Sequence, residues 1–189
     1  MNSAKKFLFP QPRLGEDKMP TDASFDILRE WWQQLENDKG ERATLRRASS
    51  LTEVMLSPVF MRLLWALRNR GYAIGNGNIQ LSKIAALAGL AARVKTQTDI
   101  GLATRMGTPK PGGCSPTFSE LRLRRILARD DIEELYTLLR RALALLGDQA
   151  NLADLAATIW NWAPLDDKRP YDPRRRLAYD YYAAAPIKP

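Results

Sequence analysis

The sequence predicts an all-α protein of about eight amphipathic helices, arranged in two small helical-bundle lobes. Apolar residues recur at helical spacing through most of the chain, and capping residues or prolines precede several of these stretches. No stretch shows the alternation of apolar and polar residues that is typical of a half-buried strand. A length of 189 residues and an apolar fraction of 45% suit one domain, or two small lobes that share a boundary.

The first half of the chain predicts a loose tail followed by a helical lobe. Residues 1–20 contain proline, lysine and glycine without apolar periodicity, so they are expected to form the tail. Residues 21–94 are expected to form the N-terminal lobe, in which Gly40 separates the first two helices and Ser57 with Pro58 begins the third. The helices predicted in this lobe cover residues 24–37, 41–48, 58–70 and 79–93.

A Gly/Pro-rich segment and a second lobe complete the chain. Residues 95–116 have little periodicity and predict a long mobile loop or hinge. Residues 117–189 are expected to form the C-terminal lobe, where Asp131 with Glu134 resembles a capping box. The helices predicted in this lobe cover residues 118–129, 131–146, 151–163 and 172–185.

The residue types that most enzymes use are scarce. Histidine is absent, and Cys114 is the single cysteine. The commonest general base and the usual zinc ligand are therefore missing, and an intrachain disulfide is excluded. We expect no catalytic activity, no metal site and no cofactor. Neither a bilayer-spanning apolar run nor a signal-peptide pattern occurs, so a cytoplasmic protein without a membrane partner is expected.

Basic residues are concentrated in the middle of the chain. Between Lys39 and Arg129 there are 16 lysines and arginines against four acidic residues, a local net charge of +12. The rest of the chain carries 13 basic and 17 acidic residues, a net charge of −4. Charge of one sign raises the local concentration of a polyanion, so this segregation favours a nucleic-acid partner over a merely solvated basic surface.

Adjacent arginines recur along the predicted helices, where at least one side chain of each pair must face outward. They are Arg46-Arg47, Arg124-Arg125, Arg140-Arg141 and the triplet Arg174-Arg175-Arg176. The guanidinium fork suits phosphate oxygens, and nothing arranges these side chains to read bases, so salt-sensitive contacts with the nucleic-acid backbone are expected. For the triplet, ion pairing with Asp172 and Asp180 is an equally good explanation.

Two other functions remain open from the residues alone. Residues 81–90 resemble the first helix and turn of a helix-turn-helix regulator, although residues 91–99 are short and weakly apolar for a recognition helix. Paired acids could serve an acid-dependent, Mg²⁺-requiring nuclease, although helix capping and solvation also explain them. These acids are Asp130-Asp131, Glu133-Glu134 and Asp166-Asp167.

The adjacent residues Trp31 and Trp32 also allow two interpretations. They point about 100° apart on a helix, so one is expected in the core and the other at a helix–helix or subunit contact. Stacking on a nucleic-acid base is the alternative.

Five short motifs follow one another in a distinctive order. They are Trp31-Trp32 with residues 40–48 (GERATLRRA), 119–130 (SELRLRRILARD), 138–143 (LLRRAL), 159–162 (IWNW) and 174–182 (RRRLAYDYY). Together they extend over most of the chain. In this order they resemble the CasB family, the small subunit of the type I-E CRISPR surveillance complex, Cascade.

The resemblance implies a fold, a task and partners. It implies an all-α fold of two helical lobes and a subunit that is present as a head-to-tail pair. The implied partners are the crRNA-bearing backbone subunits, the large subunit and a second copy of the chain. The implied task is to stabilise the R-loop between crRNA and target DNA, with a basic face that holds the displaced DNA strand. Base pairing reads the sequence in such complexes, so backbone affinity suffices.

The resemblance also implies which basic residues contact nucleic acid. At matching positions they are Arg46, Arg47, Arg129, Arg140 and Arg141. Basic residues of the loops and of the predicted helix at 118–129 add Arg70, Lys95, Arg105, Lys110, Arg122, Arg125, Lys168 and Arg169. The sequence departs from the family pattern in the long segment 95–116 and at Leu177, where the closing helix usually has tryptophan.

Overall fold

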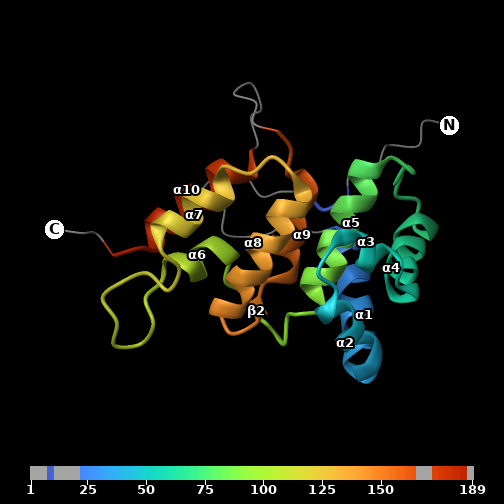
Figure 1. Cartoon of the computed structure of the whole chain (residues 1–189), viewed down its shortest axis with the longest axis horizontal. Helices are drawn as coiled ribbons and strands as arrows, with labels where there is room; N and C mark the ends of the chain where they lie inside the picture. Colours follow the sequence, from blue (N-terminus) through green and yellow to red (C-terminus); the bar gives the residue numbers. More distant parts are fainter. Residues whose placement is uncertain (1–7, 11–21, 165–171, 187–189) are drawn as a thin grey trace.

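A computed structural model describes residues 8–10, 22–164 and 172–186 and shows an all-α protein, as predicted (Figure 1). The described residues form ten helices and one pair of two-residue parallel strands. The helices are α1 (Ala23–Asn37), α2 (Lys39–Arg47), α3 (Leu51–Met55), α4 (Pro58–Asn69), α5 (Asn78–Ala91), α6 (Leu102–Gly107), α7 (Glu120–Leu127), α8 (Ile132–Leu145), α9 (Leu152–Asn161) and α10 (Pro173–Ala184). The eight expected helices are all present, and the two additional ones, α3 and α6, are too short to give a periodic signal.

Local capping explains where most of these helices begin. The Ser57, Asp131 and Asp172 side chains each accept a hydrogen bond from a backbone N–H in the first turn, as the capping residues predicted. Asn151 accepts two such bonds, from Ala153 N at 3.0 Å and Asp154 N at 3.1 Å.

The boundary between α1 and α2 differs from the prediction. It lies at Asp38, whose carboxylate accepts a hydrogen bond from Glu41 N at 2.9 Å, whereas Gly40 is inside α2. The prediction of a break at Gly40 was wrong. The Asp38 cap begins α2 two residues earlier, and the helix then continues through Gly40.

The segment 95–116 is more ordered than its composition predicted. It contains β1 (Thr96–Gln97), which pairs in parallel with β2 (Gln149–Ala150), and the whole of α6. The α6 helix packs on α10, and Asp154 of α9 accepts a hydrogen bond from Leu102 N at 2.7 Å. Each of these partners is distant in sequence, which explains why a local reading of the segment as one irregular loop was wrong.

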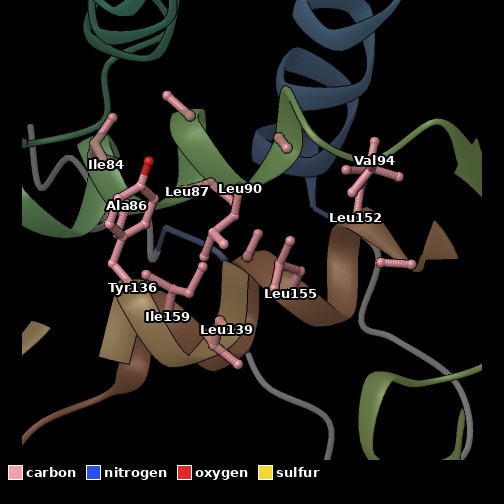
Figure 2. Close-up of a cluster of buried hydrophobic side chains, with 14 of the residues drawn as sticks. Ile84, Ala86, Leu87, Leu90, Val94, Tyr136, Leu139, Leu152, Leu155 and Ile159 are labelled. Carbon is pink, nitrogen blue, oxygen red and sulfur yellow. The ribbon is translucent and has the colours of Figure 1, made fainter. Parts of the chain in front are cut away.

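The α5 helix lies at the centre of the molecule. Its residues 84–91 are all buried, so α5 is covered on every side rather than on one face. It packs against α3, α8 and α9, and Figure 2 shows its side chains among those of α8 and α9. The labelled side chains of this contact are Ile84, Ala86, Leu87, Leu90, Tyr136, Leu139, Leu155 and Ile159. The helices on both sides of the predicted lobe boundary thus share one hydrophobic core.

Gly89 allows the side chain of Tyr136 on α8 to pack directly against the backbone of α5. A Cβ atom there would lie 2.6 Å from the hydroxyl oxygen of Tyr136 on α8. The Tyr136 hydroxyl donates a hydrogen bond to the Ala48 carbonyl at 3.0 Å, which ties α8 to the end of α2.

Both adjacent tryptophans are buried. The Trp31 indole donates a hydrogen bond to the Val59 carbonyl at 3.1 Å, and the Trp32 indole donates one to the Val94 carbonyl at 3.0 Å. The two indole rings point in different directions on α1, so each donates a hydrogen bond to a different segment. Trp31 binds α4, and Trp32 binds the chain just after α5. Neither is available to stack on a base.

Two arginines of the closing helix are structural. Arg174 is buried, lies 4.4 Å from the centre of the Trp162 ring and forms ion pairs with Asp130 at 2.7 Å and Asp172 at 3.6 Å. It also donates to the backbone carbonyls of Leu127, Arg129 and Ala163. Arg176 is buried and pairs with Asp154 and with Asp180. For both residues, the ion-pair explanation of the arginine triplet holds.

We expect the variant Arg174→Ala to lose about 3 kcal/mol of unfolding free energy, because it leaves a buried carboxylate and several carbonyls without their donor. Urea unfolding of the full-length protein measures this loss. Arg141→Ala changes an exposed arginine of α8 and is expected to stay within about 0.5 kcal/mol of the wild type. Equal stability of the two variants would contradict the structural role.

Candidate nucleic-acid interface

A tight turn after α8 places one carboxylate among several cations. Gly147 and Asp148 both have positive φ, at 72° and 56°, and Asp148 N donates to the Leu143 carbonyl at 2.8 Å. The Asp148 carbonyl accepts a hydrogen bond from Lys95 N at 2.7 Å, just before β1 pairs with β2. The backbone therefore fixes the Asp148 side chain beside the segment that leaves α5.

Three cations from two segments meet at this carboxylate. Lys95 Nζ lies 3.1 Å from Asp148 Oδ2, Arg93 Nη2 lies 3.5 Å from Oδ1, and Arg46 Nη2 lies 4.0 Å from Oδ2. The carboxylate is only 9% exposed, whereas Lys95 is 57% and Arg46 38% exposed. We call Arg46, Arg93, Lys95 and Asp148 the Asp148 cluster. One carboxylate cannot neutralise three cations, so the cluster presents excess positive charge to solvent.

Two further arginines flank the Asp148 cluster. Arg140 of α8 donates to the Arg46 carbonyl at 3.5 Å, and its guanidinium lies 5.4 Å from the centre of the Tyr136 ring. Arg105 of α6 donates to Gln149 Oε1 at 2.9 Å and to the Leu146 carbonyl at 3.3 Å. Burial raises the pKa of the Tyr136 phenol, and the positive charges of Arg140 and Arg93 oppose that rise.

Side chains of α1 and α2 form hydrogen bonds with the backbone of the segment that carries Arg93 and Lys95. Arg42 of α2 donates to the carbonyls of Ala92 and Val94, and the Trp32 indole donates to the same Val94 carbonyl. These bonds fix the chain as it leaves α5. The cations of the Asp148 cluster are thus positioned by the core rather than by their own flexible side chains.

Donors exceed acceptors at this surface. Within the described ranges, the buried Nε atoms of Arg46, Arg93 and Arg105 have no hydrogen-bond partner. Their terminal nitrogens carry the contacts to Asp148, Gln149 and Leu146 instead. A bound polyanion could reach the exposed terminal nitrogens of Arg46 and Lys95 but not the buried Nε atoms.

The structure brings some predicted residues together and leaves others apart. Arg46, Lys95, Arg105 and Arg140 lie in or beside the Asp148 cluster, and the exposed Arg47 and Arg141 follow two of them on α2 and α8. Arg129 lies before the opposite end of α8, roughly 20 Å away along the helix, and pairs with Glu134 at 3.1 Å.

The remaining predicted residues lie elsewhere. Arg122 and Arg125 are exposed on α7, which packs on α10 away from the lower edge where α2 and β2 lie (Figure 1). Arg70 follows α4, and Lys110 is exposed in the loop after α6. Lys168 and Arg169 lie outside the described residues.

Sequence reasoning missed Arg93 and Asp148. A usable signal was the closely spaced basic pair Arg93 and Lys95, at the end of the helix predicted at residues 79–93. Asp148 carried no comparable signal, because its role depends on a turn conformation and on cations from distant segments.

The two alternative functions do not fit this geometry. After α5 the chain passes into β1 rather than a second helix, and residues 84–91 are buried, so α5 cannot begin a helix-turn-helix motif. The paired acids before and within α8 have structural partners. Asp130 pairs with Arg174 at 2.7 Å, Asp131 caps α8, Glu133 accepts from Leu51 N at 2.9 Å, and Glu134 pairs with Arg129. Asp166 and Asp167 lie outside the described residues.

The described part of the chain has neither a metal-binding group of side chains nor a membrane-spanning helix. No group of three or more histidine, cysteine, aspartate or glutamate side chains in it could hold a metal ion. Each of its helices is too short or too polar to cross a membrane.

Comparisons with known proteins identify the family. The family model described as CRISPR-associated protein Cse2 matches residues 41–182, about three quarters of the chain. A solved structure of E. coli Cascade bound to a PAM-containing dsDNA target, with a 32-nt spacer, contains a chain of similar fold. The TM-score is 0.58 at 21% sequence identity, over 84% of this chain and 93% of the E. coli chain. No curated protein sequence matches significantly. The chain therefore belongs to the CRISPR-associated protein Cse2 family, the CasB small subunits of type I-E Cascade that its ordered motifs resemble.

Proposed function

We propose that this protein is a non-catalytic subunit of a type I-E Cascade complex, and that it stabilises the R-loop by sequence-independent contacts with the DNA backbone. The observation that carries the proposal is the Asp148 cluster, where three cations from distant segments surround one carboxylate and Arg105 and Arg140 lie beside them. The matched E. coli chain belongs to a Cascade complex bound to a dsDNA target, which supports the same setting.

The displaced DNA strand is the partner that this surface suits best. Its bases are unpaired and its phosphates are accessible, whereas the target strand pairs with crRNA. Exchange of a DNA duplex for an RNA–DNA duplex is nearly balanced in free energy, so a few contacts can decide its direction. Charge-assisted hydrogen bonds contribute about 1.5–3 kcal/mol each. Three or four phosphates held at the Asp148 cluster would therefore shift the balance toward the R-loop.

The subunit needs no catalytic group for this task. Among the described residues, the candidate acids of a nuclease take part in capping, ion pairs and a backbone hydrogen bond. Holding a strand requires positive charge in a fixed place. The cations around Asp148 supply the charge, and the core and the Asp148 carboxylate hold these cations in place. Recognition of sequence is left to crRNA pairing.

We also propose that the chain assembles with the backbone and large subunits and with a second copy of itself in a head-to-tail pair. Six of the large exposed apolar side chains in the described residues fall into two sets. Leu56, Trp65 and Ile79 belong to the N-terminal half, and Leu121, Tyr179 and Tyr182 to α7 and α10. The α4 and α10 helices lie at opposite ends of the molecule in Figure 1. Different surfaces at opposite ends suit a heterologous contact between copies.

Salt dependence tests the proposed DNA contact. Fluorescence anisotropy of full-length protein with a single-stranded DNA should give a log Kd that rises linearly with log salt. The double variant Arg46→Gln, Lys95→Gln is expected to lower the slope by about 1.4, since each neutralised phosphate contributes about 0.7. Arg29→Gln is the control, because Arg29 is exposed on α1 and already paired with Asp26. Tight, salt-resistant binding of one duplex sequence, or an unchanged slope in the double variant, would contradict the proposal.

Asp148→Asn tests the carboxylate at the centre of the Asp148 cluster. Asparagine keeps the volume and tolerates the positive φ, so only the charge changes. Freed cations can then neutralise phosphates, and the salt slope is expected to increase by about 0.7, with tighter binding at low salt. Unfolding free energy is expected to fall by about 1 kcal/mol from repulsion among the cations. Asp26→Asn is the matched control on α1. A slope that decreases would show that Asp148 positions the cations more than it neutralises them.

Mixed variants test the head-to-tail pair. Leu56→Ser with Trp65→Ser alters one end, and Leu121→Ser with Tyr179→Ser alters the other; each is expected to halve the copies per complex in native mass spectrometry. An equal mixture of the two should restore pairing, because each variant retains the surface that the other lacks. Failure of the mixture to restore pairing would contradict a head-to-tail arrangement.

A further inference from the structure

A groove of about 410 Å³ lies next to the Asp148 cluster. It is bounded by the end of α8, by Ile100 before α6 and by the loop that follows α6. Its volume falls within the range of about 300–1,000 Å³ that is usual for small-molecule sites. The groove is therefore large enough to hold a compact ligand rather than a single side chain.

The lining of the groove combines exposed apolar surface with positive charge. Ile100 is 50% and Leu145 40% exposed, and Pro109 and Pro111 add further apolar surface. Arg105 and Lys110 supply the charge. Large aliphatic side chains that are half exposed beside two cations match a ligand with an apolar face and an attached anion. A nucleotide has both parts, because its base is flat and weakly hydrated on its faces and its phosphate is negative.

The groove and the Asp148 cluster are continuous. Leu146 and Gly147 line the groove, and Asp148 follows them directly. Arg105, at the groove wall, is held by the Leu146 carbonyl and by Gln149, the residue after Asp148. A strand whose phosphates bind the Asp148 cluster would therefore bring its next nucleotides to the groove.

We propose that this groove takes up one unpaired base of the DNA strand that the Asp148 cluster holds; the inference rests on the proposed function and extends it. The base lies between Ile100 and Leu145, and Arg105 and Lys110 contact its flanking phosphates. Such a site accepts single-stranded DNA and excludes a duplex, whose bases are stacked and paired.

The groove is built to accept any base. The hydroxyl groups of Thr108 and Thr117 donate to the backbone carbonyls of Thr104 and Thr108, so these donors are already used within the protein. Among the described residues, none that lines the groove is aromatic, and the contact proposed with a base is therefore aliphatic. Recognition without base-specific donors suits a strand whose sequence varies with every target.

Binding of intact and abasic strands tests the groove. Anisotropy at about 50 mM salt compares full-length protein on a 20-nucleotide single strand and on the same strand without bases. The wild type is expected to prefer the intact strand about fivefold, from burial of the two exposed aliphatic side chains. In the double variant Ile100→Ser, Leu145→Ser this preference should disappear, while affinity for the abasic strand stays unchanged. Leu56→Ser is the control, since it removes an exposed leucine that lies outside the groove, in the other half of the molecule.

The outcomes separate this inference from the proposed function. Equal wild-type affinity for the two strands would overturn the groove site and leave backbone binding intact. Binding of the intact strand without any binding of the abasic strand would overturn the backbone proposal, and no binding of either strand would overturn both. If the double variant keeps the base preference but is lost from the assembled complex, the groove contacts a protein subunit, and the inference is wrong.

Discussion

The burial of α5 on every side is the constraint on which the rest of the structure depends. A helix with residues 84–91 all buried must be covered by helices from both halves of the chain. The small residues of α5 allow the neighbouring helices to pack closely against it. At Gly89 the ring of Tyr136 occupies the space that a side chain would fill. Through its hydroxyl, Tyr136 also reaches the end of α2. The same packing thus draws the ends of α2 and α5 and the α8 helix together.

The positive surface is a consequence of that packing. Arg46, Arg93 and Lys95 could not approach one another without a shared counter-charge, and the buried Asp148 supplies it. Because one carboxylate balances only part of this charge, the remainder faces solvent. Ion pairs with Asp148 hold the cations, and hydrogen bonds fix the backbone of the segment that carries Arg93 and Lys95, so a bound strand would order few side chains. Preorganised charge of this kind suits the proposed role, in which the subunit stabilises an R-loop without reading its sequence.

Arginine has two separate tasks in this molecule. Arg174 and Arg176 lie inside, where Arg174 binds carboxylates and backbone carbonyls, Arg176 binds carboxylates and the Thr158 hydroxyl, and the two join α10 to α7 and α9. Arg47 and Arg141 lie outside on α2 and α8. The net charge of +8 therefore does not measure the surface available to DNA. The distribution of acceptors decides which arginines can bind a phosphate, since a guanidinium surrounded by carbonyls has no donor to spare.

Local patterns in the sequence determined the helices and the family. Periodic apolar residues and the capping residues Ser57, Asn151 and Asp172 act within one or two helical turns, and the ordered motifs indicated the Cse2 family before any contact was known. The tertiary structure alone decided the rest. The α6 helix and β1 are stabilised by Asp154 and β2, and Asp148 gathers its cations through a turn with positive φ. Such features depend on partners about 50 residues or more away in the sequence. Local periodicity does not indicate which distant residues come into contact.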